Sequence, residues 1–264
     1  MRIGSKQRLY AQLARIGKAL ASPLRLEMVE ILAQAERSVD TLAKLMRLPI
    51  ANVSHHLQVL RDGGLVIGRK EGLFVHYRLA DPRVFDLYRL MTGVGRGQLA
   101  EIDSIVEQFF GGRDGMESVS RSELLRRVRE GSVVVLDVRP PEEYDAGHVP
   151  GAISLPLESL EAGLERLPKN KPIVAYCRGP YCVMAFEAVR RLRESGKDAR
   201  RLEDGFPEWR AEGLPVAVGS GPVAGRSQAR GRPNRTGPST GLSGSARRTK
   251  RSVGQSRPAW GGRR

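Results

Sequence analysis

The chain of 264 residues is 40% hydrophobic and 28% charged, with two cysteines and a formal net charge of +15. Its length favours two modest domains, and neither a membrane span of about 18 apolar residues nor an N-terminal secretory signal is apparent. We therefore expect a soluble, cytoplasmic protein with no membrane partner. The charge is uneven, with +5 over residues 1–110, −1 over 111–218 and +11 over 219–264, so bulk charge is weak support for DNA binding by the folded part.

Two amphipathic helices are predicted at the start of the chain. Apolar residues recur every three or four positions over residues 9–20 and again over 24–32. Ser22 and Pro23 separate the two runs, and they suit the cap and the first position of the second helix.

Residues 38–66 predict a helix-turn-helix. Asp40 suits the N-cap of a short helix that ends near Arg47, residues 48–49 make the turn, and a second helix runs to Asp62. One face of that second helix is apolar, at Val53, Leu57 and Leu60. The opposite face carries short polar groups that can read base edges in a major groove, although a merely solvated face would show the same pattern. The candidate DNA-contacting residues are Asn52, Ser54, His55 and Gln58.

Residues 65–79 predict a two-stranded wing. Strands at 65–67 and 73–79 flank a turn at 69–72, which would place Arg69 and Lys70 at the tip, where they can contact phosphates or a minor groove. Residues 82–110 return to helical spacing, with an interruption at 93–97. Apolar first and last helices suggest a homodimer interface, although burial within the domain would give the same pattern.

This part of the chain resembles the ArsR/SmtB family of winged-helix dimeric repressors. The resemblance is carried by Leu-Ala-Lys-Leu at 42–45, Val-Ser-His-His-Leu-Gln-Val-Leu-Arg-Asp-Gly-Gly-Leu-Val at 53–66, the Arg-Lys-Glu-Gly turn and Tyr-Arg-Leu at 77–79. It implies a double-stranded DNA operator and a second copy of the chain as partners. Sensors of this family often bind metals through cysteines before the recognition helix, or through Asp, His and Glu on the last helix. Residues 38–48 contain no cysteine and residues 81–110 no histidine, so we expect no metal and no cofactor.

A second domain is predicted at 118–218, after a glycine-rich linker at 111–117. Strands are expected at 133–138, near 152–153, at 172–176 and near 199–202, and helices at 120–130, 141–146, 157–167 and 183–195. This alternation is typical of a small α/β domain with a parallel sheet. Residues 219–264 are rich in Gly, Ser, Pro and Arg without an apolar period, and we expect a disordered basic tail there.

Both cysteines lie in the octapeptide Tyr-Cys-Arg-Gly-Pro-Tyr-Cys-Val at 176–183. A reducing cytosol argues against a structural disulfide framework and leaves transient, reactive or metal-binding thiols as the alternatives. Cys177 ends a predicted strand, and the next helix begins about six residues later. A loop this short points backbone N–H groups and a helix N-terminus at the sulfur, which together with Arg178 nearby favours the thiolate. We therefore interpret Cys177 as a nucleophile.

Four ordered motifs make residues 118–218 resemble the rhodanese (sulfurtransferase) domain. They are Leu-Asp-Val-Arg-Pro-Pro-Glu-Glu-Tyr at 136–144, Gly-His-Val-Pro-Gly-Ala-Ile-Ser-Leu-Pro at 147–156, the cysteine loop, and Leu-Glu-Asp-Gly-Phe-Pro-Glu-Trp at 202–209 with Gly-Leu-Pro-Val at 213–216. The resemblance implies that Cys177 takes a sulfane sulfur as a persulfide and passes it to a thiol acceptor, and that Asp137 and Arg139 organise the loop. The loop residues that would cradle the sulfur are Arg178, Gly179, Pro180, Tyr181 and Cys182.

Cys182 stands where the common rhodanese loop often has a small polar or cationic residue. Its thiolate could attack a persulfide on Cys177, expelling sulfide and closing a disulfide, or leave a bridged polysulfide. A buried packing residue is the alternative. A two-cysteine metal site is less favoured, because no third ligand is apparent.

The expected fold is therefore multi-domain, with an N-terminal α+β winged helix-turn-helix and a C-terminal α/β rhodanese-like domain. The first functional hypothesis is a DNA-binding transcriptional regulator, a repressor, whose rhodanese domain accepts or senses sulfane sulfur through Cys177. The alternative is a sulfurtransferase enzyme with thiosulfate or a polysulfide as donor and the winged helix as a secondary module. An inert rhodanese fold is disfavoured, because Cys177 is intact.

Overall fold

The computed structural model describes residues 4–110, 118–168 and 170–219, which belong to one compact unit. The linker predicted at 111–117, and the predicted tail from residue 220 onward, lie outside the described residues. Within the described ranges, no helix combines the length and the apolar character needed to cross a membrane.

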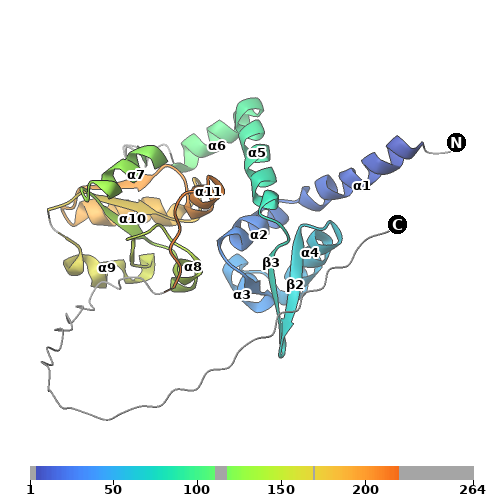
Figure 1. The fold of residues 1–264 in the computed structure, drawn as a ribbon, viewed down its shortest axis with the longest axis horizontal. Helices are drawn as coiled ribbons and strands as arrows, with labels where there is room; N and C mark the ends of the chain where they lie inside the picture. The colour runs from blue at the N-terminus through green and yellow to red at the C-terminus, as the bar shows by residue number, and fades with distance from the viewer. Residues whose placement is uncertain (1–3, 111–117, 169, 220–264) are drawn as a thin grey trace, which may run out of the picture. The chain divides into compact units, whose positions relative to one another are not determined.

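The N-terminal part is a winged helix-turn-helix, which confirms the prediction (Figure 1). Its three strands form an antiparallel sheet in the order β1-β3-β2. The elements are α1 (Ser5–Leu20), α2 (Pro23–Gln34), β1 (Arg37–Ser38), α3 (Val39–Met46), α4 (Ile50–Asp62), β2 (Val66–Glu71), β3 (Phe74–Leu79), α5 (Arg83–Gln98) and α6 (Ala100–Phe110).

The apolar face of α4 lies in the core of this domain, as its periodicity predicts. Val53, Leu57 and Leu60 have no solvent exposure, and they pack in one cluster with Met28 and Val29 of α2. The recognition helix α4 is thereby held rigidly against α2 by close-packed side chains.

The first helix of the helix-turn-helix begins differently from the prediction. Ser38 is the N-cap of α3, and its Oγ accepts a hydrogen bond from the Thr41 N–H at 3.1 Å. The prediction of Asp40 as the N-cap is wrong, because Asp40 lies in the first helical turn. A carboxylate there still interacts favourably with the N-terminal end of the helix dipole.

The wing is present, but its tip is displaced from the predicted position. Strand β2 continues to Glu71, so Arg69 and Lys70 lie along the strand and not at the tip. The turn falls at Gly72, whose φ of +59° favours glycine, and at Leu73, which is 98% exposed. Leu73, which we predicted as the first residue of the second strand, therefore belongs to the turn.

Helix α5 runs through residues 93–97, where we predicted an interruption, and the chain breaks only at Leu99. Each glycine lowers the helix propensity by about 1 kcal/mol. Packing of Val84 and Phe85 into the domain starts the helix, and no proline removes a hydrogen bond within it.

The C-terminal part is an α/β domain with a parallel sheet, again as predicted. Its five strands are ordered β4-β8-β7-β5-β6. The elements are β4 (Ser118–Val119), α7 (Arg121–Arg129), β5 (Val134–Asp137), α8 (Pro141–Ala146), β6 (Ile153–Ser154), η2 (Leu157–Ser159), α9 (Leu160–Gly163), η3 (Leu164–Arg166), β7 (Ile173–Tyr176), α10 (Val183–Glu194), β8 (Ala199–Leu202) and α11 (Phe206–Ala211).

Alternate residues of the central strands enter two separate cores. Ile173, Ala175 and Cys177 pack with apolar residues of α9 and α10, whereas Val174 and Tyr176 pack with residues of α7, α8 and α11. The sheet is therefore covered by helices on both faces, and the chain that leaves β7 enters a loop between the two layers.

Three local features differ from the prediction in this domain. The helix predicted at 157–167 is a short α-helix between two 3₁₀ turns, and β4 and α11 were not predicted. Helix α11 spans six residues, which is too short for a helical period to show in the sequence.

Candidate functional site

The two cysteines lie at the carboxyl end of β7, where the sheet positions reactive groups in α/β folds. Cys177 follows the last residue of β7 and is 1% exposed, and Cys182 is the N-cap of α10. The structure joins them in a disulfide whose Cα atoms are 6.3 Å apart, within the range that disulfides adopt. Cys177 and Cys182 can therefore react with one another without a rearrangement of the fold.

Backbone contacts with the start of α11 hold the loop between the cysteines in place. The Phe206 N–H donates to the Cys177 carbonyl at 3.0 Å, and the Cys182 N–H donates to the Gly179 carbonyl at 3.1 Å. A Cβ atom at Gly205 would lie 2.3 Å from the carbonyl carbon of Arg178, so only glycine permits this approach. This contact gives a structural reason for glycine in the motif at 202–209.

The guanidinium of Arg178 points to a buried carboxylate and not to the sulfur atoms. Its Nη2 lies 2.6 Å and its Nε 3.0 Å from Oε1 of Glu143, which has no solvent exposure. Arg37 of β1 binds the same oxygen at 3.0 Å. Glu143 thus forms ion pairs with both arginines, and the positive charge of Arg178 is paired with that carboxylate.

Asp137 and Arg139 form a buried ion pair beside the loop. Arg139 Nη2 lies 2.6 Å from Asp137 Oδ2, both side chains have no solvent exposure, and the Tyr176 hydroxyl donates to the same oxygen at 2.5 Å. Burial raises the pKa of the Tyr176 hydroxyl, and the negative charge of Asp137 adds to that shift. Among the hydrogen bonds of the described residues, Asp137 accepts none from the cysteine loop between Cys177 and Cys182, and Arg139 donates none to it.

The connection to the loop passes through Gln34, the last residue of α2. Its Nε2 donates to the Arg178 carbonyl at 2.9 Å, and its Oε1 accepts from Arg139 Nη1 at 3.0 Å. Gln34 has no solvent exposure, so both halves of its amide are used within the protein. A residue of the DNA-binding domain therefore takes part in the hydrogen bonds of the cysteine loop.

Sequence reasoning missed three residues of this network, namely Gln34, Arg37 and Glu143. Glu143 lies within the motif at 136–144, but nothing in its neighbours distinguishes a buried glutamate from an exposed one. Gln34 and Arg37 lie in the other domain, more than 100 positions from their partners. Their roles left no local signal in the sequence.

Two carboxyl groups flank the loop at Gly179. A Cβ atom there would lie 3.0 Å from Glu30 Oε1 and 3.8 Å from Glu208 Oε1. Burial raises the pKa of Glu208 to about 7, and the nearby charge of Glu30 contributes to the increase. Burial also raises the pKa of Glu30, although Arg178 opposes that shift. A cavity of about 170 Å³ adjoins these groups, with Tyr181 in its lining.

The candidate DNA-contacting residues lie where the sequence predicted. Asn52, Ser54, His55 and Gln58 are all exposed on α4, opposite its buried face. On the wing, Arg69 and Lys70 are both exposed, and Arg69 is bound by Glu36 at 3.0 Å and by Glu71 at 2.8 Å. Because two carboxylates hold Arg69, Lys70 is the better placed of the two for a phosphate. Within the described ranges, no group of three or more His, Cys, Asp or Glu side chains could hold a metal ion.

Comparison with known proteins gives matches for both halves of the chain. Residues 120–212 match the family model of the rhodanese-like domain, and residues 20–69 match that of a helix-turn-helix domain. The HTH-type transcriptional regulator Rv0324 of Mycobacterium tuberculosis is 44% identical over 215 residues, which cover 81% of this chain and 94% of that protein. A transcriptional repressor SmtB homolog of Synechocystis sp. is 44% identical over 78 residues, 30% of this chain and 59% of that protein. A solved structure, the homodimeric winged helix-turn-helix DNA-binding domain of Mb0332 from Mycobacterium bovis, is 38% identical and covers 38% of this chain and 92% of that chain, with a TM-score of 0.35.

Proposed function

We propose that this chain, which belongs to the ArsR/SmtB-type helix-turn-helix transcriptional regulators that carry a rhodanese-like domain, receives sulfane sulfur on Cys177 and thereby changes its affinity for DNA. The chain is a DNA-binding regulator by its family. In this proposal it acts as a repressor on a double-stranded operator, and the rhodanese domain is its sensor.

The observation that carries the proposal is the position of Gln34 between the two domains. Its hydrogen bonds join the Arg178 carbonyl in the cysteine loop to Arg139, and Gln34 is the last residue of α2. A change of the loop backbone at Arg178 therefore cannot occur without changing the hydrogen bonds of α2. Since α2 packs against the recognition helix α4, this hydrogen bond supports a route from the loop to the DNA-contacting face.

The chemistry of the proposed sensor conserves atoms and electrons. The Cys177 thiolate attacks the terminal sulfane sulfur of a polysulfide and forms a bond to it. The bond between that sulfur and the rest of the polysulfide breaks, a polysulfide one sulfur shorter leaves, and Cys177 becomes a persulfide. The Cys182 thiolate can then attack the Cys177 sulfur, which expels hydrosulfide and closes the disulfide between the two residues. The 6.3 Å separation of the Cα atoms supports this second step, because the pair reaches the disulfide within the native loop.

We expect polysulfide to shift the operator affinity of the reduced wild-type protein by between about 5- and 150-fold, the usual range of coupling between two sites. Cys177→Ser should show no shift. Cys182→Ser is the matched control, because it should keep one sulfur on Cys177 but form no disulfide. Fluorescence anisotropy with an operator obtained by in vitro selection gives the affinities, and intact-mass spectrometry gives the sulfur content. Equal affinity in every sulfur state would contradict the sensor role.

A sulfurtransferase enzyme is the second candidate, and the rhodanese-like match over residues 120–212 favours it. The two candidates differ in turnover. Steady consumption of thiosulfate by the wild-type protein, lost in Cys177→Ser, would assign catalysis. A single sulfur uptake without turnover would support the sensor.

A homodimer is part of the proposal, and an exposed apolar surface supports it. Leu9 and Leu13 of α1 are 58% and 54% exposed, and Leu90 and Val94 of α5 are 68% and 65% exposed. Leu13, Leu90 and Val94 line one apolar hollow between α1 and α5. Burying such a surface against a second copy of the chain removes it from water and aligns two recognition helices with a two-fold operator.

The recognition helix and the wing should affect DNA binding in different ways. Gln58→Ala should lower specific affinity by about 1–3 kcal/mol and relax specificity at one base position, because amide groups read base edges. Lys70→Ala should weaken binding to all sequences and reduce the slope of log affinity against log salt by about 1. Lys171→Ala, in the rhodanese domain, is the control and should leave operator binding unchanged. An unchanged salt slope in Lys70→Ala would show that Lys70 of the wing does not contact a DNA phosphate.

A further inference from the structure

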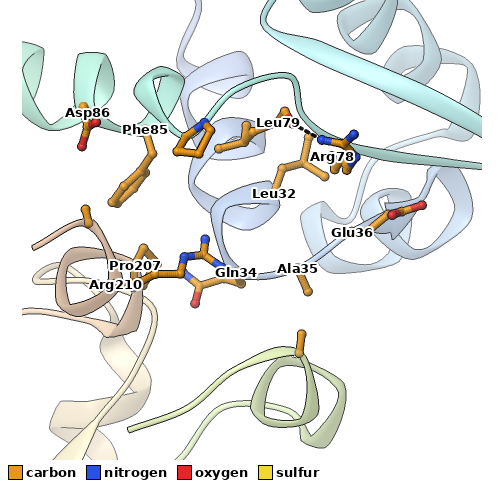
Figure 2. Close-up of a pocket in the computed structure, with 13 residues that line it drawn as sticks. Leu32, Gln34, Ala35, Glu36, Arg78, Leu79, Phe85, Asp86, Pro207 and Arg210 are labelled. Carbon is orange, nitrogen blue, oxygen red and sulfur yellow. Dashed lines mark hydrogen bonds between the residues drawn. The ribbon is translucent and has the colours of Figure 1, made fainter. Parts of the chain in front are cut away.

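A second cavity, of about 620 Å³, lies between the two domains (Figure 2). The winged helix contributes residues from α2, β3 and α5, and the rhodanese domain contributes residues from α8 and α11. The residues that matter for its chemistry are Leu32, Leu79, Phe85, Pro207, Arg78 and Arg210. In Figure 2, Phe85 lies on one side of the cavity, and Pro207 and Arg210 lie on the other.

The size and the lining suit a small organic molecule. Ligand cavities usually measure about 300–1,000 Å³ and combine an apolar wall with a few polar groups. Here the apolar wall comes from both domains, with Leu32, Leu79 and Phe85 on one side and Pro207 on the other. The cavity is separate from the one beside the cysteine loop, because no residue lines both.

Two carboxylates, Glu36 and Asp86, line the cavity together with the two arginines. Glu36 lines the cavity but is bound to Arg69 at 3.0 Å, and Asp86 lines it but lies 3.7 Å from Arg89. Neither of these arginines is part of the lining. Glu36 is therefore compensated from outside the cavity, whereas Arg89 has Glu212 as its closer partner, at 2.6 Å.

The two arginines of the lining have no carboxylate partner among the ion pairs of the described residues. Arg78 Nη1 donates to the Leu79 carbonyl at 3.2 Å, and Arg210 Nη2 donates to the Ala33 carbonyl. Partial burial lowers the pKa of Arg210, and repulsion from Arg139 adds to that effect. Both side chains are exposed, and a guanidinium can donate charge-assisted hydrogen bonds to an anion in the cavity.

We propose that this cavity binds a small organic anion with an apolar body, such as an aryl carboxylate or sulfonate, as a second effector of the regulator. The anionic group lies against Arg210, and the apolar body lies against Phe85 and Pro207. This site is independent of the sulfur chemistry at Cys177. Gln34 lines this cavity and also donates to the Arg178 carbonyl of the cysteine loop, so both sites contact the same residue.

The probe for the experiment is 8-anilinonaphthalene-1-sulfonate, which combines a sulfonate with an apolar aromatic body. Fluorescence titration of the full chain should give saturable binding. Arg210→Gln should weaken it roughly tenfold, as expected for loss of a charge-assisted hydrogen bond, and Arg78→Gln, on the other side of the cavity, should weaken it less. Arg78 is exposed and bonded only to the carbonyl of the next residue, so its variant should fold normally. N-phenyl-1-naphthylamine, the uncharged analogue, should bind the wild type and both variants equally.

Leu90→Ser is the control for adventitious binding to the exposed apolar surface of α1 and α5, and it should leave the titration unchanged. Binding that is lost in Leu90→Ser, or that is unchanged in both arginine variants, would overturn the proposal. Sulfur uptake by Cys177 should be normal in Arg78→Gln, so failure of this site would be distinguishable from failure of the sulfur sensor.

Discussion

Asp137→Ala should destabilise the chain by about 3–5 kcal/mol, the cost of leaving a buried charge without its partner. Arg139 has no solvent exposure, and its Nε and Nη2 both bind the Asp137 carboxylate. Removing Asp137 also leaves the Tyr176 hydroxyl without the acceptor that lies at 2.5 Å. Urea unfolding followed by circular dichroism and by tryptophan fluorescence gives the change in the free energy of unfolding.

Glu123→Ala is the matched control for this experiment. Glu123 also binds arginines, at 2.8 Å from Arg126 and 2.7 Å from Arg127, but the side chain of Arg126 is 57% exposed. Water already solvates much of that pair, so we expect a much smaller loss than in Asp137→Ala. Similar losses in the two variants would show that the buried pair does not carry the stability assigned to it.

Gln34→Leu should abolish the response of DNA binding to sulfur and leave sulfur uptake intact. Leucine occupies a similar volume but cannot donate to the Arg178 carbonyl or accept from Arg139. The sulfur-dependent shift in operator affinity should fall from the range of about 5- to 150-fold towards one. Anisotropy titrations of the reduced and the polysulfide-treated protein measure this ratio, and intact-mass spectrometry confirms that Cys177 still gains sulfur.

Gln34→Leu also leaves buried hydrogen-bonding groups without a partner, which costs about 1–3 kcal/mol for each group. Thermal unfolding should therefore accompany the titrations, at a temperature where the variant is folded. Gln108→Leu, at an exposed position of α6, makes the same substitution without touching the network and should keep the full response. A full response in Gln34→Leu would show that the sulfur signal reaches the recognition helix by another route.

Local periodicity was sufficient to predict the helix-turn-helix and the parallel α/β domain. The inward face of α4 follows from the spacing of Val53, Leu57 and Leu60, because a helix repeats every 3.6 residues whatever surrounds it. The boundaries were less predictable. Ser38 and Asp40 are both good cap residues, and in the structure Ser38 has the extended backbone and the hydrogen bond from the Thr41 N–H that define the cap. The glycines at 93–97 do not end α5, because a helix that has already formed at Val84 and Phe85 adds one backbone hydrogen bond with each further residue.

The sequence by itself determined the family, the two domains and Cys177 as the proposed sulfur acceptor, because these rest on motifs of neighbouring residues. Only the tertiary structure decided that Cys182 pairs with Cys177 and that Gln34 joins the cysteine loop to the DNA-binding domain. Gln34 and the Arg178 carbonyl are 144 positions apart in the sequence. A single hydrogen bond between such distant residues leaves no repeat, residue spacing or composition bias by which the sequence could reveal it. Such a contact depends on how the two domains pack against one another.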